Sequence, residues 1–143
     1  QYTVMIKLKN DKTLEVLVIS QFIKDMSFEN FRTNEKNLKD INYKLNINVN
    51  VEKADDVISN VILHLFCEAS DETGNIYILE IQYGGTFKIS YTEKKERRRV
   101  LMVDCPNLLF PFLRRIAYDI TKEGGFSPLN IKPMDFSSFQ DNT

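Results

Sequence analysis

The chain has 143 residues, a length that suits one domain, and its formal net charge is −1. Hydrophobic residues make up 43% and charged residues 27%, which excludes a disordered chain and a membrane-embedded one. Because 19 basic side chains nearly balance 20 acidic ones, the overall charge gives no argument for nucleic-acid binding. We therefore expect a single domain over residues 1–143.

The cysteines and the first residues indicate a cytoplasmic protein. Cys67 and Cys105 lie far apart and form no CxxC motif, so we expect free thiols rather than a disulfide or a zinc site. Lysines interrupt the apolar residues of 4–9, a pattern that no signal peptide has. No run approaches the roughly 20 apolar residues of a membrane-spanning helix.

The first half of the chain reads as strands. Residues 3–9 and 13–19 are predicted to form two short strands around the polar turn Asn10-Asp11-Lys12, and the polar residues 30–40 a long connection. The clearest strand covers 41–52, where apolar side chains occupy every odd position. Such alternation places one row on a core and the other toward water.

A hairpin is predicted next. Residues 57–69 form a strand that is apolar on both sides, 71–75 the turn, and 76–83 the return strand. Gly84-Gly85 then allows a bulge or a bend. In the return strand we expect helices to cover one row, and the alternate row to face water or a partner. The covered row consists of Tyr77, Leu79, Ile81 and Tyr83.

The charged residues 93–99 are predicted to form a loop between two further strands, at 86–91 and 100–103. Five of the six residues 94–99 are basic. A solvated loop is the simplest interpretation of such a run, and contact with an anion or an acidic partner is the alternative.

One amphipathic helix is predicted near the end of the chain. Asn107 is a suitable N-cap, and Pro111 fits only the first turn or a kink because it has no N–H to donate. Gly124-Gly125 is predicted to end the helix, and Phe136 and Phe139 to open a short last helix. The apolar residues recur at helical spacing and form one stripe, Leu109, Phe112, Ile116 and Ile120. The fold class is therefore α+β, an antiparallel meander followed by helices.

No catalytic constellation is apparent. The single histidine, His64, lies in an apolar strand and is expected to be a structural residue. Asp55-Asp56 fits a strand-ending turn better than a metal site, and no base is evident for Cys105 as a nucleophile. Gly84-Gly85 lacks the phosphate-loop pattern. The sequence predicts neither an enzyme nor a bound metal or cofactor.

Three separated blocks resemble the SecB family of protein-export chaperones. The first is Lys24-Asp25-Met26-Ser27-Phe28-Glu29. The second runs from Leu79 to Phe87 and includes Gly84-Gly85. The third is Cys105-Pro106-Asn107-Leu108-Leu109-Phe110-Pro111-Phe112, followed by Gly125 to Ile131 and Pro133 to Phe136. The resemblance covers roughly residues 14–139. It implies a four-stranded antiparallel sheet with a long helix and a short C-terminal helix packed on one face.

The resemblance also implies a function: a cytoplasmic, cofactor-free holdase. It would work as a homotetramer, a dimer of dimers, that binds unfolded secretory precursors in hydrophobic grooves. It would deliver them to the SecA ATPase, with no nucleic acid bound and no insertion into the membrane.

Three sets of site residues follow. The residues at the family's SecA-contacting positions are Asp25, Glu29, Ile78 and Glu80. The residues expected to form the client-binding groove, with core filling as an open alternative, are Phe31, Leu38, Phe136 and Phe139. The residues expected to form the oligomer interface, because one thin sheet layer cannot readily hide so much apolar surface, are Leu79, Ile81, Tyr83, Leu109, Phe112, Ile116 and Ile120.

Two rival functions stay open. Two features differ from the family pattern: the near-neutral charge, and a chain that stops soon after Phe139. Both are compatible with a SecB-like chaperone dedicated to one partner, such as an antitoxin of a toxin–antitoxin pair. A small α+β enzyme is the other rival, but it would need clustered titratable groups in a pocket.

Overall fold

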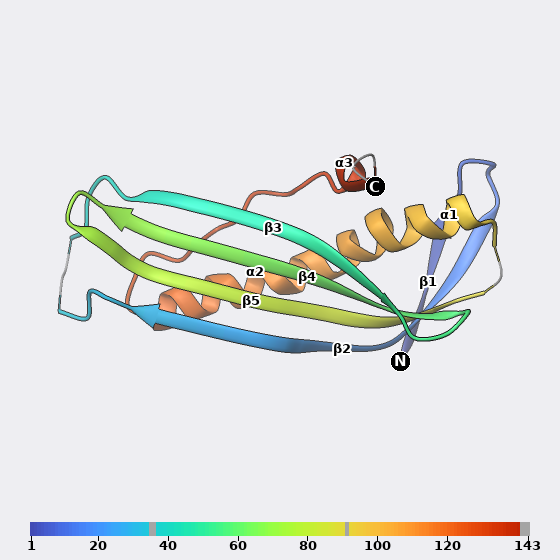
Figure 1. The fold of residues 1–143 in the computed structure, drawn as a ribbon, viewed down its shortest axis with the longest axis horizontal. Coiled ribbons are helices and arrows are strands. Elements are labelled where there is room, and N and C mark those ends of the chain that lie inside the picture. The colour runs from blue at the N-terminus through green and yellow to red at the C-terminus, as the bar shows by residue number, and fades with distance from the viewer. Residues whose placement is uncertain (35–36, 91, 141–143) are drawn as a thin grey trace.

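Five antiparallel strands form one sheet in the order β1-β2-β5-β4-β3, and a long helix crosses one face of it, in a computed structural model (Figure 1). The structure describes residues 1–34, 37–90 and 92–140. The α+β class is as predicted, with one strand more than the resemblance implies, because the N-terminal hairpin adds its own strand. The strands are β1 (Tyr2–Lys7), β2 (Thr13–Asn30), β3 (Asn42–Lys53), β4 (Ile58–Asp71) and β5 (Gly74–Ile89).

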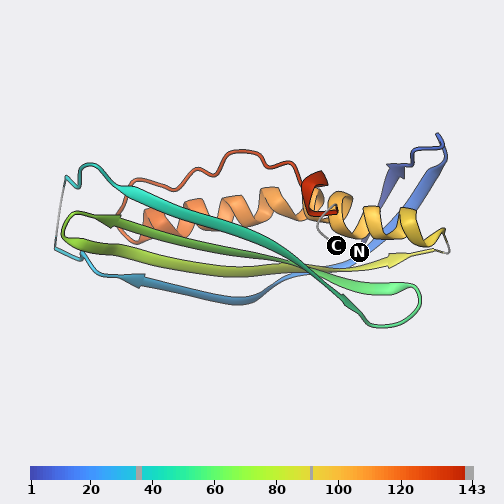
Figure 2. The ribbon, with the colours of Figure 1, turned by 45° about the horizontal axis from the view of Figure 1, so that its top comes forward.

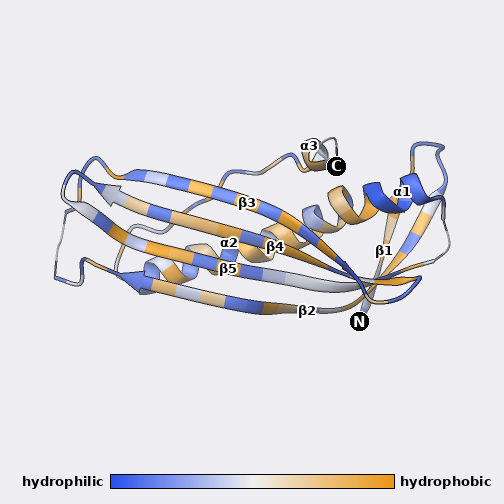
Figure 3. Cartoon of the chain, viewed as in Figure 1, coloured by the Kyte–Doolittle hydropathy of each residue, from blue (hydrophilic) through white to orange (hydrophobic). Residues whose placement is uncertain are grey.

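The strands alternate in polarity along their length (Figure 3). On β5 the row Tyr77, Leu79, Ile81 and Tyr83 is at most 8% exposed and lies under the long helix, as predicted. Across the pair, β4 places buried side chains opposite this row, with Leu65 opposite Ile81. The sheet therefore has an inner face against the helix and an outer face away from it.

The long strand β2 bends, because its pairing with β5 shifts between Val18 and Ser20 and again between Ile23 and Asp25. The predicted irregularity is therefore on β2, opposite the two glycines, while β5 runs through Gly84 and Gly85 without a break. β1 pairs only with the first part of β2, and this hairpin stands out beside the first turns of the helix (Figure 2).

The helical segment is longer than predicted. Helix α1 (Lys94–Arg99), a π-helical turn (Val100–Asp104) and helix α2 (Cys105–Glu123) follow one another without interruption. The predictions of a charged loop at 93–99, a strand at 100–103 and an N-cap at Asn107 are therefore wrong. Lys, Arg and Glu are good helix formers, so the charged run extends the helix rather than breaking it.

Two prolines lie inside this helix. The π-helical turn comes just before Pro106, where the Cys105 N–H donates to the Val100 carbonyl. Pro111 lies in mid-helix rather than in the first turn. Because proline has no N–H, each interrupts the ladder of helical hydrogen bonds, and a π-turn is one way to absorb such an interruption.

The buried stripe of α2 is rotated from the predicted one. Of the four predicted residues Leu109 is fully buried, whereas Phe112 is 36% exposed and Ile116 and Ile120 are partly buried. The fully buried residues Leu109, Leu113, Ala117 and Thr121 recur every fourth position.

Glycines end α2 as predicted. Gly125 adopts a φ of 91°, which favours glycine, and the Phe126 N–H donates to the Thr121 carbonyl. From there residues 124–136 run back along α2 to the predicted short last helix, α3 (Ser137–Gln140) (Figure 1). Phe136 anchors this return because it is fully buried against Phe110, with ring centroids 5.9 Å apart. No helix in the described ranges is both long and apolar enough to cross a membrane.

Candidate functional site

An open pocket of about 410 Å³ lies at the end of the molecule where β2 and α2 finish. Its walls come from the connection before β3, from the start of β3, from β5 and from the segment after α2. We call it the client pocket. It is lined by Asn37, Leu38, Ile41, Tyr43, Tyr77, Gly125, Phe126 and Ser127.

Aromatic side chains support the floor of the client pocket. The Tyr77 ring centroid lies 5.1 Å from that of Phe126 and 5.5 Å from that of Phe28. A Cβ on residue 124 would come within 2.6 Å of the Phe28 ring, so Gly124 allows the end of α2 to lie close to Phe28. Burial, with the Cys67 thiol nearby, raises the pKa of the Tyr77 phenol. None of the described residues that line the pocket is charged, and their polar and apolar groups both face it.

Polar contacts hold the connection after β2 in place. Arg32 donates to both carboxylate oxygens of Asp71, at 2.7 and 3.0 Å, and to the Asn75 carbonyl at 3.1 Å. These hydrogen bonds keep the pKa of the Asp71 carboxyl well below its usual range. Asn30 donates to the Gly124 carbonyl at 3.0 Å, which joins the end of β2 to the end of α2. These contacts join the end of β2 to the β4–β5 turn and to the end of α2, beside the pocket.

An exposed apolar strip continues from the client pocket along β3. Tyr43 and Leu45 are 43% and 44% exposed, and both lie on the inner face. The sequence predicted a core for this row, but only Ile47 is fully covered. The reason is that β3 is the edge strand, and α2 lies over the middle of the sheet. We call Tyr43 and Leu45 the β3 strip.

The four residues predicted for the client groove do not come together. Leu38 lines the client pocket, and Phe31 is 45% exposed at the end of β2. Phe136 and Phe139 stack on each other near the other end of the helical segment, and Phe136 is fully buried. Phe136 therefore fills the core, which the sequence left open as an alternative. The sequence reasoning missed Tyr77 and Phe126 because the fold, and not their spacing, joins them.

The four residues at the predicted SecA-contacting positions do share one surface. Across the β2–β5 pair Glu29 lies opposite Ile78, Ser27 opposite Glu80, and Asp25 opposite Gln82. All are on the outer face, and Asp25 and Glu29 are exposed. The Nε2 atom of His64 lies 2.6 Å from Glu80 Oε1, so the histidine has a structural partner. We call Asp25, Glu29, Ile78 and Glu80 the acidic face.

The residues predicted for the oligomer interface divide into two groups. Leu79, Ile81 and Leu109 are fully buried inside the chain and cannot reach a second copy. Tyr83, 8% exposed, lies under Phe112, with stacked rings 6.2 Å apart. The accessible part joins α2 to the inner side of β2. We call it the α2–β2 patch, and it consists of Phe112, Ile116, Ile120, Ile23 and Met26.

The remaining titratable groups of the described residues have structural environments. Among the residues that the structure describes, no group of three or more His, Cys, Asp or Glu could hold a metal ion. Burial raises the pKa of Cys67 to about 11 and raises that of Cys105 as well, which disfavours a reactive thiolate. Asp55 accepts hydrogen bonds from the backbone N–H groups of Val57 and Ile58, so it forms the predicted turn.

Comparison with known proteins identifies the family. The family model described as preprotein translocase subunit SecB matches residues 9–143. The protein-export protein SecB of Agrobacterium fabrum is 40% identical, with 84% of this chain and 77% of the relative covered. That of Bartonella bacilliformis is 36% identical, with 91% and 84% covered.

A solved structure shows the same fold. It is the SecB-like chaperone Rv1957 of Mycobacterium tuberculosis, in complex with a ChAD peptide from the HigA1 antitoxin. Its TM-score to this chain is 0.70, with 15% identity and coverage of 83% of this chain and 90% of the other. On the sequence matches, the chain belongs to the SecB family of protein-export chaperones.

Proposed function

We propose that this chaperone captures unfolded precursor proteins in the client pocket and along the β3 strip. The observation that carries the proposal is the pocket of about 410 Å³, with aromatic side chains in its floor, that continues into apolar side chains more than 40% exposed. Apolar segments of an unfolded client would bury this surface, at about 25 cal/mol per Å². Capture then depends on mass action and on many weak contacts, with no nucleotide hydrolysis.

The edge position of β3 gives a second mode of contact. β3 pairs with β4 along one side only, so its other side presents main-chain donors and acceptors. An extended client can hydrogen-bond to such an edge whatever its sequence. Side chains in the client pocket and backbone at the edge together suit a chaperone that accepts many clients.

We propose that the acidic face delivers clients to the SecA ATPase. Asp25, Glu29 and Glu80 place three carboxylates on the outer face, where Ile78 lies opposite Glu29. Such a surface attracts a cationic partner and speeds its association, an effect that salt weakens. The face lies on the opposite side of the sheet from the α2–β2 patch and the β3 strip, so a client and the ATPase could bind together.

We also propose that the working form is a tetramer, a dimer of dimers, in the cytoplasm. The support is the α2–β2 patch, where Ile23, Met26 and Phe112 are 47%, 39% and 36% exposed. Contiguous apolar surface of this kind commonly marks an interface between subunits. Buried thiols without a disulfide are compatible with a reducing compartment.

The alternative is a chaperone dedicated to one partner. It rests on the fold shared with the Mycobacterium tuberculosis SecB-like chaperone that binds an antitoxin peptide. The identity to that protein is 15%, against 36% and 40% to the two export proteins above, which favours export.

One experiment separates these functions. Several unrelated proteins, reduced and unfolded, would be diluted with equimolar chaperone, and light scattering would follow their aggregation with and without ATP. The export function predicts suppression for most clients and no effect of ATP. If a cognate partner is protected and generic clients aggregate as in buffer, the dedicated function is correct.

A further inference from the structure

A second and larger cavity lies near the other end of the sheet from the client pocket. Its volume is about 660 Å³, and it opens between α1 and the ends of β3 and β4 that their turn joins. Val51, Leu101 and Met102 give it an apolar floor. We call it the basic cleft, because the cationic side chains in its walls are Lys53, Lys94, Arg97 and Arg98.

Cations outnumber carboxylates in the lining of the basic cleft. Asp56 is the only carboxylate among the described residues that line it, against the four cations. It lies 3.5 Å from Lys53, and both side chains are largely exposed, so this pair is weak. The neighbouring Asp55 accepts hydrogen bonds from two backbone amides of its turn and also interacts electrostatically with Arg97, so it offsets only part of the excess.

Arg97 holds an unused donor at the cleft wall. Its Nη1 atom donates to the Ile89 carbonyl at 3.2 Å, and its Nη2 atom is buried with no hydrogen-bond partner among the described residues. A buried donor without a partner is uncommon and calls for a ligand or an ordered water. A carboxylate entering the cleft would lie beside this guanidinium.

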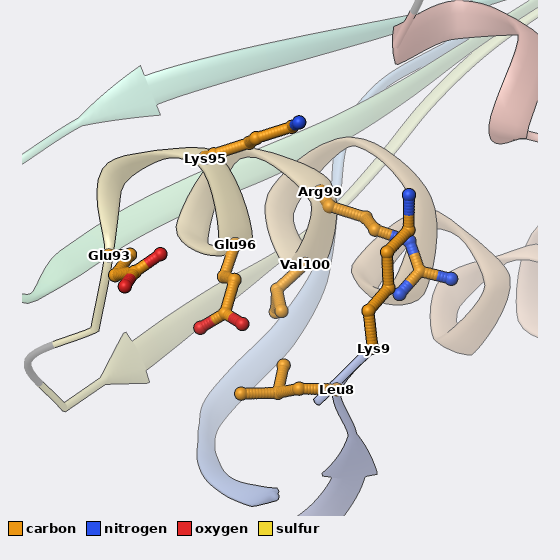
Figure 4. Close-up of a pocket in the computed structure, with 7 residues that line it drawn as sticks. All are labelled: Leu8, Lys9, Glu93, Lys95, Glu96, Arg99 and Val100. Carbon is orange, nitrogen blue, oxygen red and sulfur yellow. The ribbon is translucent and has the colours of Figure 1, made fainter. Parts of the chain in front are cut away.

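The other side of α1 provides the contrast. There a cavity of about 150 Å³ separates α1 from the β1–β2 hairpin (Figure 4). The carboxylates of Glu93 and Glu96 line it together with the cations of Lys9, Lys95 and Arg99. Thr92 also donates to Glu96, at 3.0 Å. Three cations face two carboxylates on this side of the helix, against four cations and one carboxylate in the basic cleft, so the larger cationic excess lies in the basic cleft.

We propose that the basic cleft binds an acidic peptide segment that also carries apolar side chains, contributed by a partner protein. Carboxylates of the segment would meet Lys53, Arg97 and Arg98, and its apolar side chains would cover Leu101 and Met102. A free phosphate would leave the apolar floor uncovered. A nucleic acid would need a continuous basic surface, and the chain has a net charge of −1. This site is separate from the client pocket and from the acidic face, and goes beyond the proposed function.

The test uses a short labelled peptide that alternates Glu or Asp with Leu or Phe, and fluorescence anisotropy. We expect binding that weakens as salt rises. The double variant Lys53→Glu with Arg98→Glu should weaken it at least about tenfold, because two attractive charges become repulsive. Both residues are exposed, so the fold should survive, and thermal unfolding checks this.

The controls test separately whether peptide binding depends on charge, on apolar contact and on the position of the charges in the cleft. Lys12→Glu with Lys132→Glu changes the net charge equally at exposed sites outside the cleft, and should leave affinity within twofold. Peptides with Gln for the acids, or Ser for the apolar residues, should each bind at least about fivefold more weakly. Equal affinity for wild type and the cleft variant would refute the site. Tighter binding of a single-stranded oligonucleotide than of the peptide would refute the peptide ligand.

Discussion

Removing the β3 strip gives the sharpest prediction for client capture. The change is Tyr43→Ser together with Leu45→Ser, in side chains that are 43% and 44% exposed. Full burial of one large apolar side chain contributes about 1.5–3 kcal/mol, so the exposed part of each offers a client about 0.7–1.3 kcal/mol. Some of this is lost to ordering of the client. We expect an affinity about five- to thirtyfold lower, at roughly 1.4 kcal/mol per factor of ten.

Equilibrium binding of a labelled, reduced and unfolded client is the assay, with anisotropy as the readout. The matched control is Tyr2→Ser with Met5→Ser, in side chains on β1 that are 42% and 61% exposed. Urea unfolding of each variant separates loss of binding from loss of stability. The reasoning fails if the strip variant binds within twofold of wild type, or if the β1 control loses as much affinity.

Three further predictions concern the other surfaces. Phe112→Arg places a charge in the α2–β2 patch and should reduce the assembled mass measured by light scattering; an unchanged tetramer would remove the patch from the interface. Asp25→Lys with Glu80→Lys should weaken SecA binding in calorimetry, more at low salt than at moderate salt, while client capture persists; unchanged affinity at both salts would exclude the acidic face. Because Arg32 depresses the pKa of Asp71 in the folded state, the stabilisation it gives is present above the ordinary value of 3.8 and is lost as pH falls. Asp71→Asn should therefore lower the free energy of unfolding most at pH 7, and progressively less as pH falls from 3.8 toward the depressed pKa of the folded state; a loss that does not shrink with acidification would contradict this.

Strands were predictable because their signals are local. Alternation over 41–52 identified β3 to within about one residue, and the Asp71–Asn75 turn located the β4–β5 hairpin. Exposure was not predictable in the same way. The β3 row looks like a core row in sequence, and only the position of β3 at the sheet edge leaves Tyr43 and Leu45 uncovered.

Helix α2 shows that the spacing of apolar residues alone does not identify the buried side of a helix. Apolar residues occur on more than one side of α2, so the spacing of Phe112, Ile116 and Ile120 selected a neighbouring stripe. The true stripe includes Thr121, a polar residue that is buried because its hydroxyl donates to the Ala117 carbonyl at 2.8 Å and accepts from the Leu129 N–H at 2.8 Å. The hydrogen bond from Leu129 depends on the segment that returns along α2, so a sequence pattern cannot show that the Thr121 hydroxyl has its partners.

The central claim is that clients bind at the client pocket and the β3 strip. Photo-crosslinking tests it most directly. A benzophenone amino acid would replace Leu45 in one variant, Met5 in a second and Asp25 in a third, and each would be irradiated with an unfolded precursor. The account predicts strong crosslinks from position 45 and background levels from positions 5 and 25. Crosslinks from position 5 or 25 that equal or exceed those from position 45 would contradict it.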